Sequence, residues 1–96
     1  KWDELEKIRE LNMTIPIAVL VNSNVNPIDA LPFAKKIKAI AINPYFKDLN
    51  QKNIEKIQST GLKVFPYTIN ELDDIERMIE LGVDAIITDY PERINK

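Results

Sequence analysis

Histidine and cysteine are both absent from the 96 residues of this sequence. Imidazole is the commonest acid or base near neutral pH and a frequent metal ligand, so a self-contained mechanism would depend on carboxylates, lysine or tyrosine. Without cysteine there is neither a disulfide framework nor thiolate chemistry, and the redox compartment stays open. The two glycines, Gly61 and Gly82, form no Gly-rich phosphate loop, which argues against a dinucleotide site.

Long hydrophobic runs and a strong charge are also missing. The longest apolar stretch, residues 15–21, is interrupted by Pro16, and about 20 apolar residues are needed to cross a bilayer, so we predict no membrane span. We find no signal peptide, and the compartment stays undetermined, with the cytoplasm favoured for this chain. A net charge of −2 and a pI near 5.1 argue against a nucleic-acid or anionic-membrane surface.

The composition is that of a globular protein, with 45% hydrophobic and 29% charged residues. A chain of this length can bury a modest core, so we expect one domain or part of one. It starts without an initiator Met and directly on a helical pattern. We therefore expect residues 1–96 to be a fragment of a larger domain.

Helical and strand patterns alternate four times along the chain. The spacing of apolar residues predicts helices over residues 2–11, 27–38, 50–59 and 70–81. Asn70 is the expected N-cap of the last helix, and Gly61 and Gly82 are expected just beyond the ends of the last two. Short apolar runs predict strands over residues 15–21, 39–43, 63–68 and 84–89. The strands start near 16, 39, 63 and 84, which gives steps of 23, 24 and 21 residues. Such regular βα units predict a parallel sheet with right-handed connections.

Two architectures accept this order of elements: an open doubly wound sheet, and one arc of a (β/α)8 barrel. The strands alternate in residue size, which favours the barrel. With Asn43 at a barrel mouth, the small Ala41 points inward and Ile42 faces the helices.

The third predicted strand follows the same rule. Phe65 and Tyr67 point into the barrel, and Val64 points outward to the surrounding helices. Pro66 lacks the N–H that a strand ladder uses, so we expect a bulge or irregular pairing there.

Two motifs near the end of the chain resemble the C-terminal part of glycerophosphodiester phosphodiesterases. They are Gly-Leu-Lys-Val-Phe-Pro-Tyr-Thr-Ile-Asn at 61–70 and Gly-Val-Asp-Ala-Ile-Ile-Thr-Asp-Tyr-Pro at 82–91, and between them lies a helix that ends in Met-Ile-Glu-Leu-Gly. The first half of the chain shares the helix and strand rhythm of that family, and also Leu-Val-Asn-Ser at 20–23 after an apolar strand. The resemblance covers the last four strands of the family's barrel.

The resemblance implies an α/β fold in which four βα repeats form the C-terminal half of a (β/α)8 TIM barrel with parallel strands. Residues 1–96 would then be a single half-barrel domain, a fragment of a larger phosphodiesterase domain. The family hydrolyses glycerophosphodiesters to glycerol 3-phosphate and an alcohol, in lipid metabolism. It uses a divalent cation, Ca or Mg, and a pair of histidines, one of them in a His-Arg-Gly motif; all of these lie upstream of the matched region. We assign no catalytic and no metal-binding residue to this chain, and we expect it to be inactive alone.

Two residues are candidates for lining the substrate. The family has an aromatic residue just before Thr-Val-Asn, at the glycerol end of the substrate, and this position is Tyr67, before Thr68-Ile69-Asn70. Packing inside the barrel is the alternative for Tyr67, whose hydroxyl needs a partner in either case. Asn43 ends a strand and could face substrate, although Asn-Pro is also an ordinary turn signal.

Several carboxylates have simpler explanations than catalysis. Asp89 precedes Pro91 and is expected to bond backbone amides in a turn rather than a metal. Glu71, Asp73 and Asp74 open a predicted helix, where negative charge is favourable. The lysines at 35, 36 and 38 lie where another helix is expected to end, and the macrodipole explains them equally well.

A second hypothesis of a different class stays open: a non-catalytic half-barrel that acts as a structural or interaction module by self-association. Under either hypothesis the unpaired strand edges and the inward apolar face need cover. We therefore predict a homo-oligomer, with a two-fold dimer as its simplest form. A His-Arg-Gly motif and metal carboxylates encoded upstream of this segment would favour the enzyme.

Overall fold

Three short parallel strands form the centre of the molecule, which is described by a computed structural model over residues 2–93. The helices are α1 (Asp3–Leu11), α2 (Leu31–Lys36), α3 (Gln51–Ser59) and α4 (Leu72–Leu81). The strands are β1 (Ala18–Leu20), β2 (Ala41–Asn43) and β3 (Lys63–Val64), and the 3-10 helices are η1 (Pro27–Ala30), η2 (Phe46–Asp48) and η3 (Pro91–Arg93). None of the helices in this part of the chain has the length and apolar character that spanning a membrane requires.

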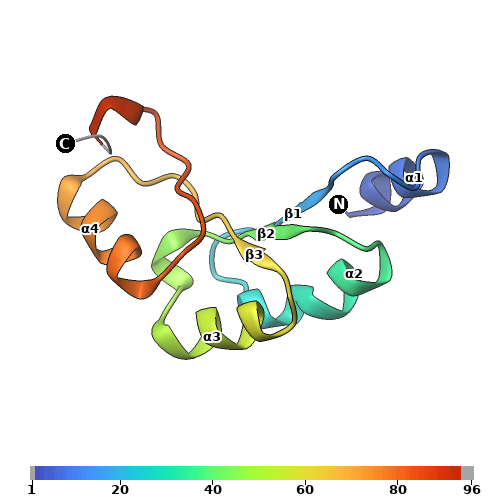
Figure 1. Cartoon of the computed structure of the whole chain (residues 1–96), viewed down its shortest axis with the longest axis horizontal. Helices are drawn as coiled ribbons and strands as arrows, with labels where there is room; N and C mark the ends of the chain where they lie inside the picture. The colour runs from blue at the N-terminus through green and yellow to red at the C-terminus, as the bar shows by residue number, and fades with distance from the viewer. Residues whose placement is uncertain (1, 94–96) are drawn as a thin grey trace.

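The strands pair in sequence order, β1 with β2 and β2 with β3, and both pairs are parallel. A helix connects each strand to the next, so the predicted βαβ rhythm and parallel sheet are confirmed. In Figure 1, α2 and α3 lie on one side of the sheet, and α1 and α4 stand at its two ends. The radius of gyration, 13.5 Å, exceeds the roughly 12.5 Å of a compact chain of this length because the two end helices project outward.

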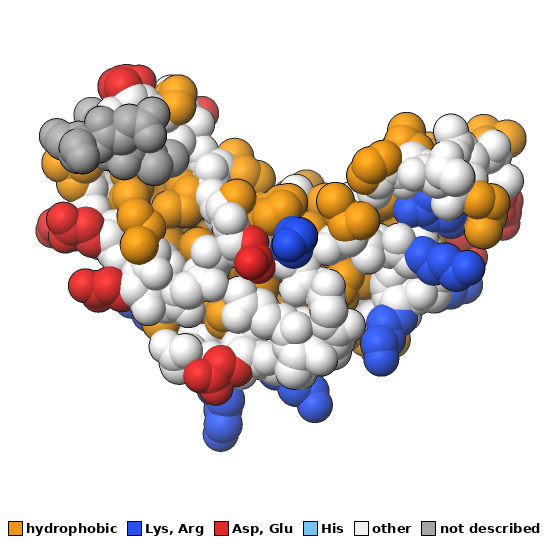
Figure 2. All heavy atoms as spheres, in the orientation of Figure 1, with side chains coloured by type: hydrophobic (Ala, Val, Ile, Leu, Met, Phe, Trp, Pro, Cys, Tyr) orange, Lys and Arg blue, Asp and Glu red, His pale blue; other side chains and the backbone are white. Residues whose placement is uncertain are grey.

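The two faces of the sheet differ in burial. Val19, Ile42 and Val64 are aligned across the three strands and are fully buried in the core with α2 and α3. Side chains alternate along a strand, so the neighbouring positions lie on the opposite face, where Leu20 is 50% exposed. Figure 2 shows hydrophobic side chains gathered along this hollowed side. The nearly continuous apolar run at residues 15–21 predicts a strand covered on both faces. Within residues 2–93 that prediction is wrong, because β1 is covered on one face only.

Residues 84–89, where we expected a fourth strand, run beside the end of β3 without forming a regular strand. The amide of Asp84 donates to the carbonyl of Val64, and the amide of Ile87 donates to the carbonyl of Pro66, both at 3.0 Å. The acceptors are two residues apart and the donors three, so this segment holds one extra residue, as a bulge does. Pro66 has no N–H with which to return a bond, so the expected irregular pairing at Pro66 is confirmed.

The helix expected over residues 27–38 is divided in two. Its first turn is the 3-10 helix η1, capped by the side chain of Asn26, and α2 begins only at Leu31. Pro32 then lies in the first turn of α2, where a missing N–H costs nothing because that group would have no intrahelical partner. The position of Pro32 thus explains the break.

Helix α3 has the ends that the sequence predicts. The side chains of Asn50 and Asn53 each accept a hydrogen bond from the other's backbone amide, which makes a capping box. Gly61, just beyond the helix, has a φ of 91°, a left-handed conformation that glycine adopts without strain.

Helix α4 begins one residue later than expected. Glu71 occupies the N-cap position, and the predicted cap, Asn70, directs its side chain to Thr88 and Asp89 instead. Its C-terminus agrees with the prediction, because Gly82 ends it with a φ of 85°.

Helix α1 is held by polar contacts at its inner side and by Trp2 and Leu5, which pack against the core. Arg9 is buried, and its guanidinium donates to the carbonyl of Ile37 at 2.6 Å and to that of Lys38 at 3.3 Å, where α2 ends. Of the apolar residues of this helix, Leu5 packs against the core, whereas Ile8 is 42% and Leu11 87% exposed. Within residues 2–93 Ile8 and Leu11 have little to pack against, because α1 stands at one end of the sheet.

Candidate functional site

The carboxyl ends of β1, β2 and β3 lie at one edge of the sheet because the strands are parallel. The loops that follow them, at residues 21–26, 44–50 and 65–71, therefore lie side by side. In parallel α/β proteins this edge is the usual place for ligands. Both sequence-predicted site residues, Asn43 and Tyr67, come from it.

Tyr67 is fixed by residues that follow β1 and β2. Its amide donates to the carbonyl of Pro44, and its own carbonyl accepts from the amide of Phe46, each at 3.0 Å. Its hydroxyl donates to the carbonyl of Val21, just beyond β1, at 2.8 Å, and its ring lies tilted on that of Tyr45 with 5.9 Å between centroids. Tyr67 thus spans the sheet edge and presents an immobilised ring.

The environment of the Tyr67 phenol favours the neutral form. Burial raises the pKa of Tyr67 above the ordinary value of 10.0, and the charges of Asp48 and Tyr45 raise this pKa further. A protonated hydroxyl is needed for the bond to the Val21 carbonyl. Near neutral pH the Tyr67 phenol therefore stays protonated and is not a base.

Asn43 ends β2 on the less covered face of the sheet, aligned with Leu20 of β1. The residue is half-buried, and its Oδ1 atom is fully buried without a hydrogen-bond partner among residues 2–93. An unsatisfied buried oxygen costs about 1–3 kcal/mol. Such an oxygen is suited to accept a hydrogen bond from a hydroxyl or amide that the described residues do not supply.

Two further residues at this edge, Tyr45 and Asp48, escaped the sequence reasoning. Tyr45 follows Asn43 by two positions, and strand alternation could have placed it on the same face as Asn43 and Tyr67. The Asp48 carboxylate accepts from the amide of Asn24 at 2.8 Å and so ties two loops together. Asn24 has a φ of 66°, which asparagine tolerates. No local sequence pattern could have linked Asn24 to Asp48, because the two residues are 24 positions apart.

The carboxylates for which the sequence predicts no catalytic role have structural roles. The Asp89 carboxylate accepts from the Nδ2 of Asn70 at 3.2 Å, and the Oδ1 of Asn70 accepts from the Asp89 amide at 3.0 Å. We expected the Asp89 carboxylate to accept from backbone amides in the turn, whereas it accepts from the side-chain amide of Asn70. Asp73 and Asp74 lie in the first turn of α4, as expected.

The side chains in residues 2–93 do not fit a divalent cation site. Within that range there is no cluster of three or more histidine, cysteine, aspartate or glutamate side chains that could hold a metal ion. Hard divalent cations need several oxygen ligands together. The chemistry that this edge can supply is an aromatic wall, an amide acceptor and the exclusion of water.

The architecture now defines the class: an α/β chain with parallel strands and a TIM-barrel-like fold. The sequence model of the glycerophosphoryl diester phosphodiesterase family matches residues 1–93. The chain belongs to this family.

Two bacterial relatives illustrate the sequence similarity. The chain is 32% identical over 96 residues to a glycerophosphodiester phosphodiesterase of Bacillus subtilis, a match that covers 98% of the chain and 33% of the relative. It is 38% identical over 61 residues to a glycerophosphodiester phosphodiesterase of Caldanaerobacter subterraneus, covering 64% of the chain and 25% of the relative. The chain thus spans a third or less of the length of these relatives.

Solved structures share the fold. A putative glycerophosphoryl diester phosphodiesterase of Silicibacter pomeroyi superposes with a TM-score of 0.83 at 28% identity, over 98% of this chain and 34% of that one. An Oleispira antarctica phosphodiesterase, solved with the product sn-glycerol-3-phosphate, superposes with a TM-score of 0.86 at 19% identity, over 99% of this chain and 38% of that one. The second likeness concerns the fold alone.

Proposed function

We propose that this chain is the C-terminal half of the barrel of a glycerophosphodiester phosphodiesterase, built from four βα repeats. The complete enzyme hydrolyses glycerophosphodiesters to glycerol 3-phosphate and an alcohol, in lipid metabolism. The observation that carries the proposal is the family match over residues 1–93 in a chain that spans only about a third of its relatives. In this proposal residues 1–96 form one half-barrel domain of a larger phosphodiesterase domain.

The chain contributes to substrate binding and not to proton transfer. Attack on a phosphodiester builds negative charge on the non-bridging oxygens, which a divalent cation neutralises when bound, and the leaving alkoxide needs a proton. The sequence has no histidine, and the described carboxylates do not gather. We assign the cation, Ca or Mg, and the acid and base to the rest of the enzyme.

Within that site Tyr67 and Asn43 line the substrate. The Tyr67 ring is immobilised by the bond to Val21 and the contact with Tyr45, so it can pack against the carbon atoms of a glycerol group. The unsatisfied Oδ1 of Asn43 can accept a bond from a glycerol hydroxyl. Both groups act by orienting the substrate and excluding water.

The purified chain should not release glycerol 3-phosphate from glycerophosphocholine with added Ca²⁺ or Mg²⁺. Activity should appear when the chain replaces its matching segment in the Bacillus subtilis relative. There Tyr67→Leu should lower kcat/KM about tenfold because the ring is lost, whereas Tyr67→Phe keeps the ring and most of the activity. Turnover by the isolated chain, or equal activity of the two variants, would contradict the proposal.

A second candidate function is a non-catalytic half-barrel that associates with a second copy of itself. The observation that favours it is the exposure of apolar side chains at both ends of the molecule, among them Leu20 and Ile8 near β1 and Ile79 and Ile87 near the C-terminus. If this candidate is right, the chain alone forms a homodimer. The Bacillus subtilis relative that carries the chain in place of its matching segment then has no hydrolase activity. That second result separates it from the first candidate.

A further inference from the structure

A polar groove of about 400 Å³ lies between η1 and α3, two elements that are in contact with each other. Its lining residues belong to these two elements or to the caps in front of them, and they are Asn26, Ile28, Asn50, Lys52, Asn53 and Lys56. Both walls of the polar groove therefore come from neighbouring βα units of this chain.

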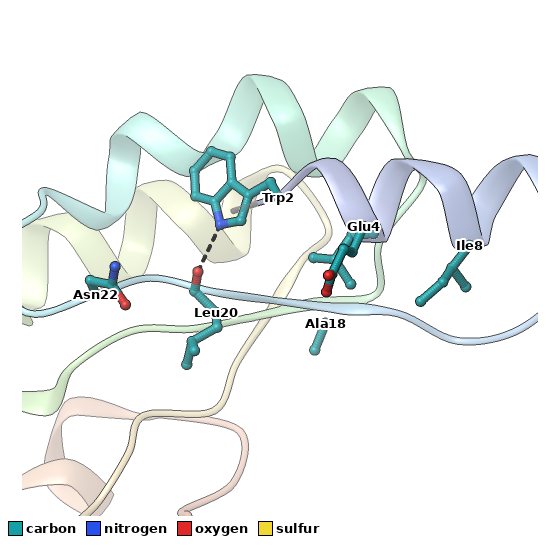
Figure 3. A pocket seen from close by; sticks show the side chains of 7 residues that line it. Trp2, Glu4, Ile8, Ala18, Leu20 and Asn22 are labelled. Carbon is teal, nitrogen blue, oxygen red and sulfur yellow. Dashed lines mark hydrogen bonds between the residues drawn. The ribbon is translucent and has the colours of Figure 1, made fainter.

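The apolar groove of about 380 Å³ between α1 and β1 has a different setting (Figure 3). It borders the outer edge of β1, along which no other strand of residues 2–93 lies, and Trp2, Glu4, Leu20 and Asn22 are among its lining residues. The indole Nε1 of Trp2 donates to the carbonyl of Leu20 at 2.9 Å. Under the proposed function the barrel continues beyond this edge, so the fold accounts for the apolar groove. The fold does not account for the polar groove.

The caps of η1 and α3 orient the asparagine side chains of the polar groove. The Oδ1 of Asn26 accepts from the amide of Ile28 at 3.0 Å. The Oδ1 atoms of Asn50 and Asn53 accept from each other's backbone amides at 2.8 and 2.9 Å, and the Nδ2 of Asn53 donates to the carbonyl of Asp48 at 2.9 Å. Because each Oδ1 is held by a backbone amide, the Nδ2 groups of Asn26 and Asn50 remain as hydrogen-bond donors for a ligand.

Lys52 and Lys56 add positive charge to these donors. The two lysines are exposed and lie four positions apart on one face of α3, and neither forms an ion pair within residues 2–93. Like charges at this spacing destabilise a helix, so helix stability does not explain them. No acidic side chain lines the polar groove.

We propose that the polar groove binds a phosphate dianion, either free or as a phosphate monoester. The Nδ2 groups of Asn26 and Asn50 donate to its oxygens, and Lys52 and Lys56 neutralise its charge. A phosphate monoester carries close to two negative charges above neutral pH and has three acceptor oxygens, which match two cations and two amide donors. The inference goes beyond the proposed function and does not rest on it.

Asp48 limits the site on one side. A second cavity, of about 320 Å³, shares Asn26, Asn50 and Asn53 with the polar groove and is also lined by Asp48. The Asp48 carboxylate is negative and accepts from the amide of Asn24 at 2.8 Å. It repels a phosphate, so we place the anion at the lysine side of the shared asparagines.

Nuclear magnetic resonance titrations of the ¹⁵N-labelled chain at about pH 8 test the proposal. The ligands are inorganic phosphate, sn-glycerol 3-phosphate and, as a diester with a singly charged phosphate, glycerophosphocholine. The side-chain amide signals of Asn26 and Asn50 should shift and saturate with the two dianions, with a Kd below about 10 mM. The diester should bind at least about fivefold more weakly. Equal affinities for the two dianions would assign the phosphate group alone as the ligand, and tighter binding of glycerol 3-phosphate would assign the ester.

Asn50→Asp is the sharpest variant. It keeps the Oδ1 that caps α3, because aspartate and asparagine are comparable N-caps, but it replaces the Nδ2 donor by a carboxylate oxygen. It should weaken binding of both dianions at least about tenfold. The matched control is Asn12→Asp, which makes the same change at an exposed residue beyond α1, where Oδ1 accepts from the amides of Thr14 and Ile15. The control should change the affinity less than about twofold.

A pair of double variants tests the lysines. Lys52→Gln with Lys56→Gln should weaken binding at least about tenfold. Lys7→Gln with Lys35→Gln removes the same charge from exposed residues outside the polar groove and should change the affinity less than about twofold. The backbone amide spectrum of each variant shows that it is folded.

Three results would overturn the proposal: no saturable shift below about 10 mM, equal effects of the variants and their controls, or binding of the diester as tight as that of the dianions. None of these measurements uses hydrolysis. Their failure would therefore leave the proposed function standing, and an inactive segment exchange would leave the phosphate site standing.

Discussion

The hydroxyl of Tyr67 shows how one side chain connects two ends of the sheet. Its bond to the Val21 carbonyl spans 46 positions of the sequence and fastens the loop after β3 to the end of β1. A neutral hydrogen bond of this kind contributes about 1 kcal/mol. The sequence identified Tyr67 as a candidate through its motif, but the partner could not be found without the fold.

Tyr67 also gives the folded chain an alkaline pH dependence. The pKa of Tyr67 is raised in the folded state above 10.0, so the folded chain holds the phenolic proton at a pH where the unfolded chain releases it. The free energy of unfolding should therefore fall as the pH rises past about 10 towards the folded pKa. Urea titrations between about pH 8 and 11 measure this decline.

The control for this decline is Tyr67→Phe, which removes the titrating group. It should lower the free energy of unfolding at pH 8 by about 1 kcal/mol and flatten the fall above pH 10. An equally steep fall in the variant would show that other groups cause it.

Asn43 illustrates what residue type alone leaves open. The Asn-Pro pair at 43–44 is compatible with a simple turn and with a ligand contact. The structure adds that Oδ1 is buried without a partner in residues 2–93, which an ordinary turn residue near solvent would not show. Under the proposed function, a substrate hydroxyl would supply the donor for this atom.

At the scale of elements, α1 depends on contacts beyond its own sequence. A nine-residue helix is too short to be stable alone in water. The indole of Trp2 stacks on Phe33 with 4.9 Å between centroids, and the Arg9 guanidinium reaches the carbonyls at the end of α2. A positive charge at a helix C-terminus is favourable, so Arg9 stabilises both helices.

Replacement of Arg9 by methionine should therefore be costly. Arg9→Met keeps the apolar stem but removes the bonds to Ile37, Asn12 and Lys38, and the free energy of unfolding should fall by about 2 kcal/mol. Urea unfolding followed by circular dichroism measures this change. Glu6→Gln is the control, because it breaks only the exposed ion pair with Lys36 and should change stability far less. Equal losses in the two variants would contradict the role given to Arg9.

At the scale of the whole molecule, the two ends present apolar surface flanked by acidic helices. Any association of the chain with itself that brings α1 beside α4 works against like charge. Salt shortens the range of this repulsion, from about 10 Å at 0.1 M towards 3 Å at 1 M. Self-association should therefore be weak at low salt and stronger at about 0.5 M NaCl.

Sedimentation equilibrium at the two salt concentrations measures this dependence. The double variant Glu76→Gln with Glu80→Gln removes two acids from the middle and end of α4, and its self-association should depend less on salt. If salt instead weakens the dimer, attractive ion pairs hold it together. That result would contradict the predicted repulsion between α1 and α4.

Much of the fold could be predicted from local patterns. The C-terminal ends of α3 and α4 followed from Gly61 and Gly82, whose backbone requirements are local. The fourth strand failed as a regular element because Pro66 cannot return a ladder bond, and Asn70 failed as a cap because Thr88 and Asp89 compete for its side chain. These contacts join residues distant in sequence, which local patterns do not reveal.

The sequence by itself determined the alternation of helix and strand, the parallel sheet and the family, because periodicity, capping and motif are written in neighbouring residues. Only the tertiary structure decided that Tyr67 bonds Val21, that the Asn43 oxygen lacks a partner in residues 2–93, and that Trp2 lies on the free edge of β1. The physical reason is that burial and hydrogen-bond satisfaction depend on which distant segments meet, and these are properties of the packed chain.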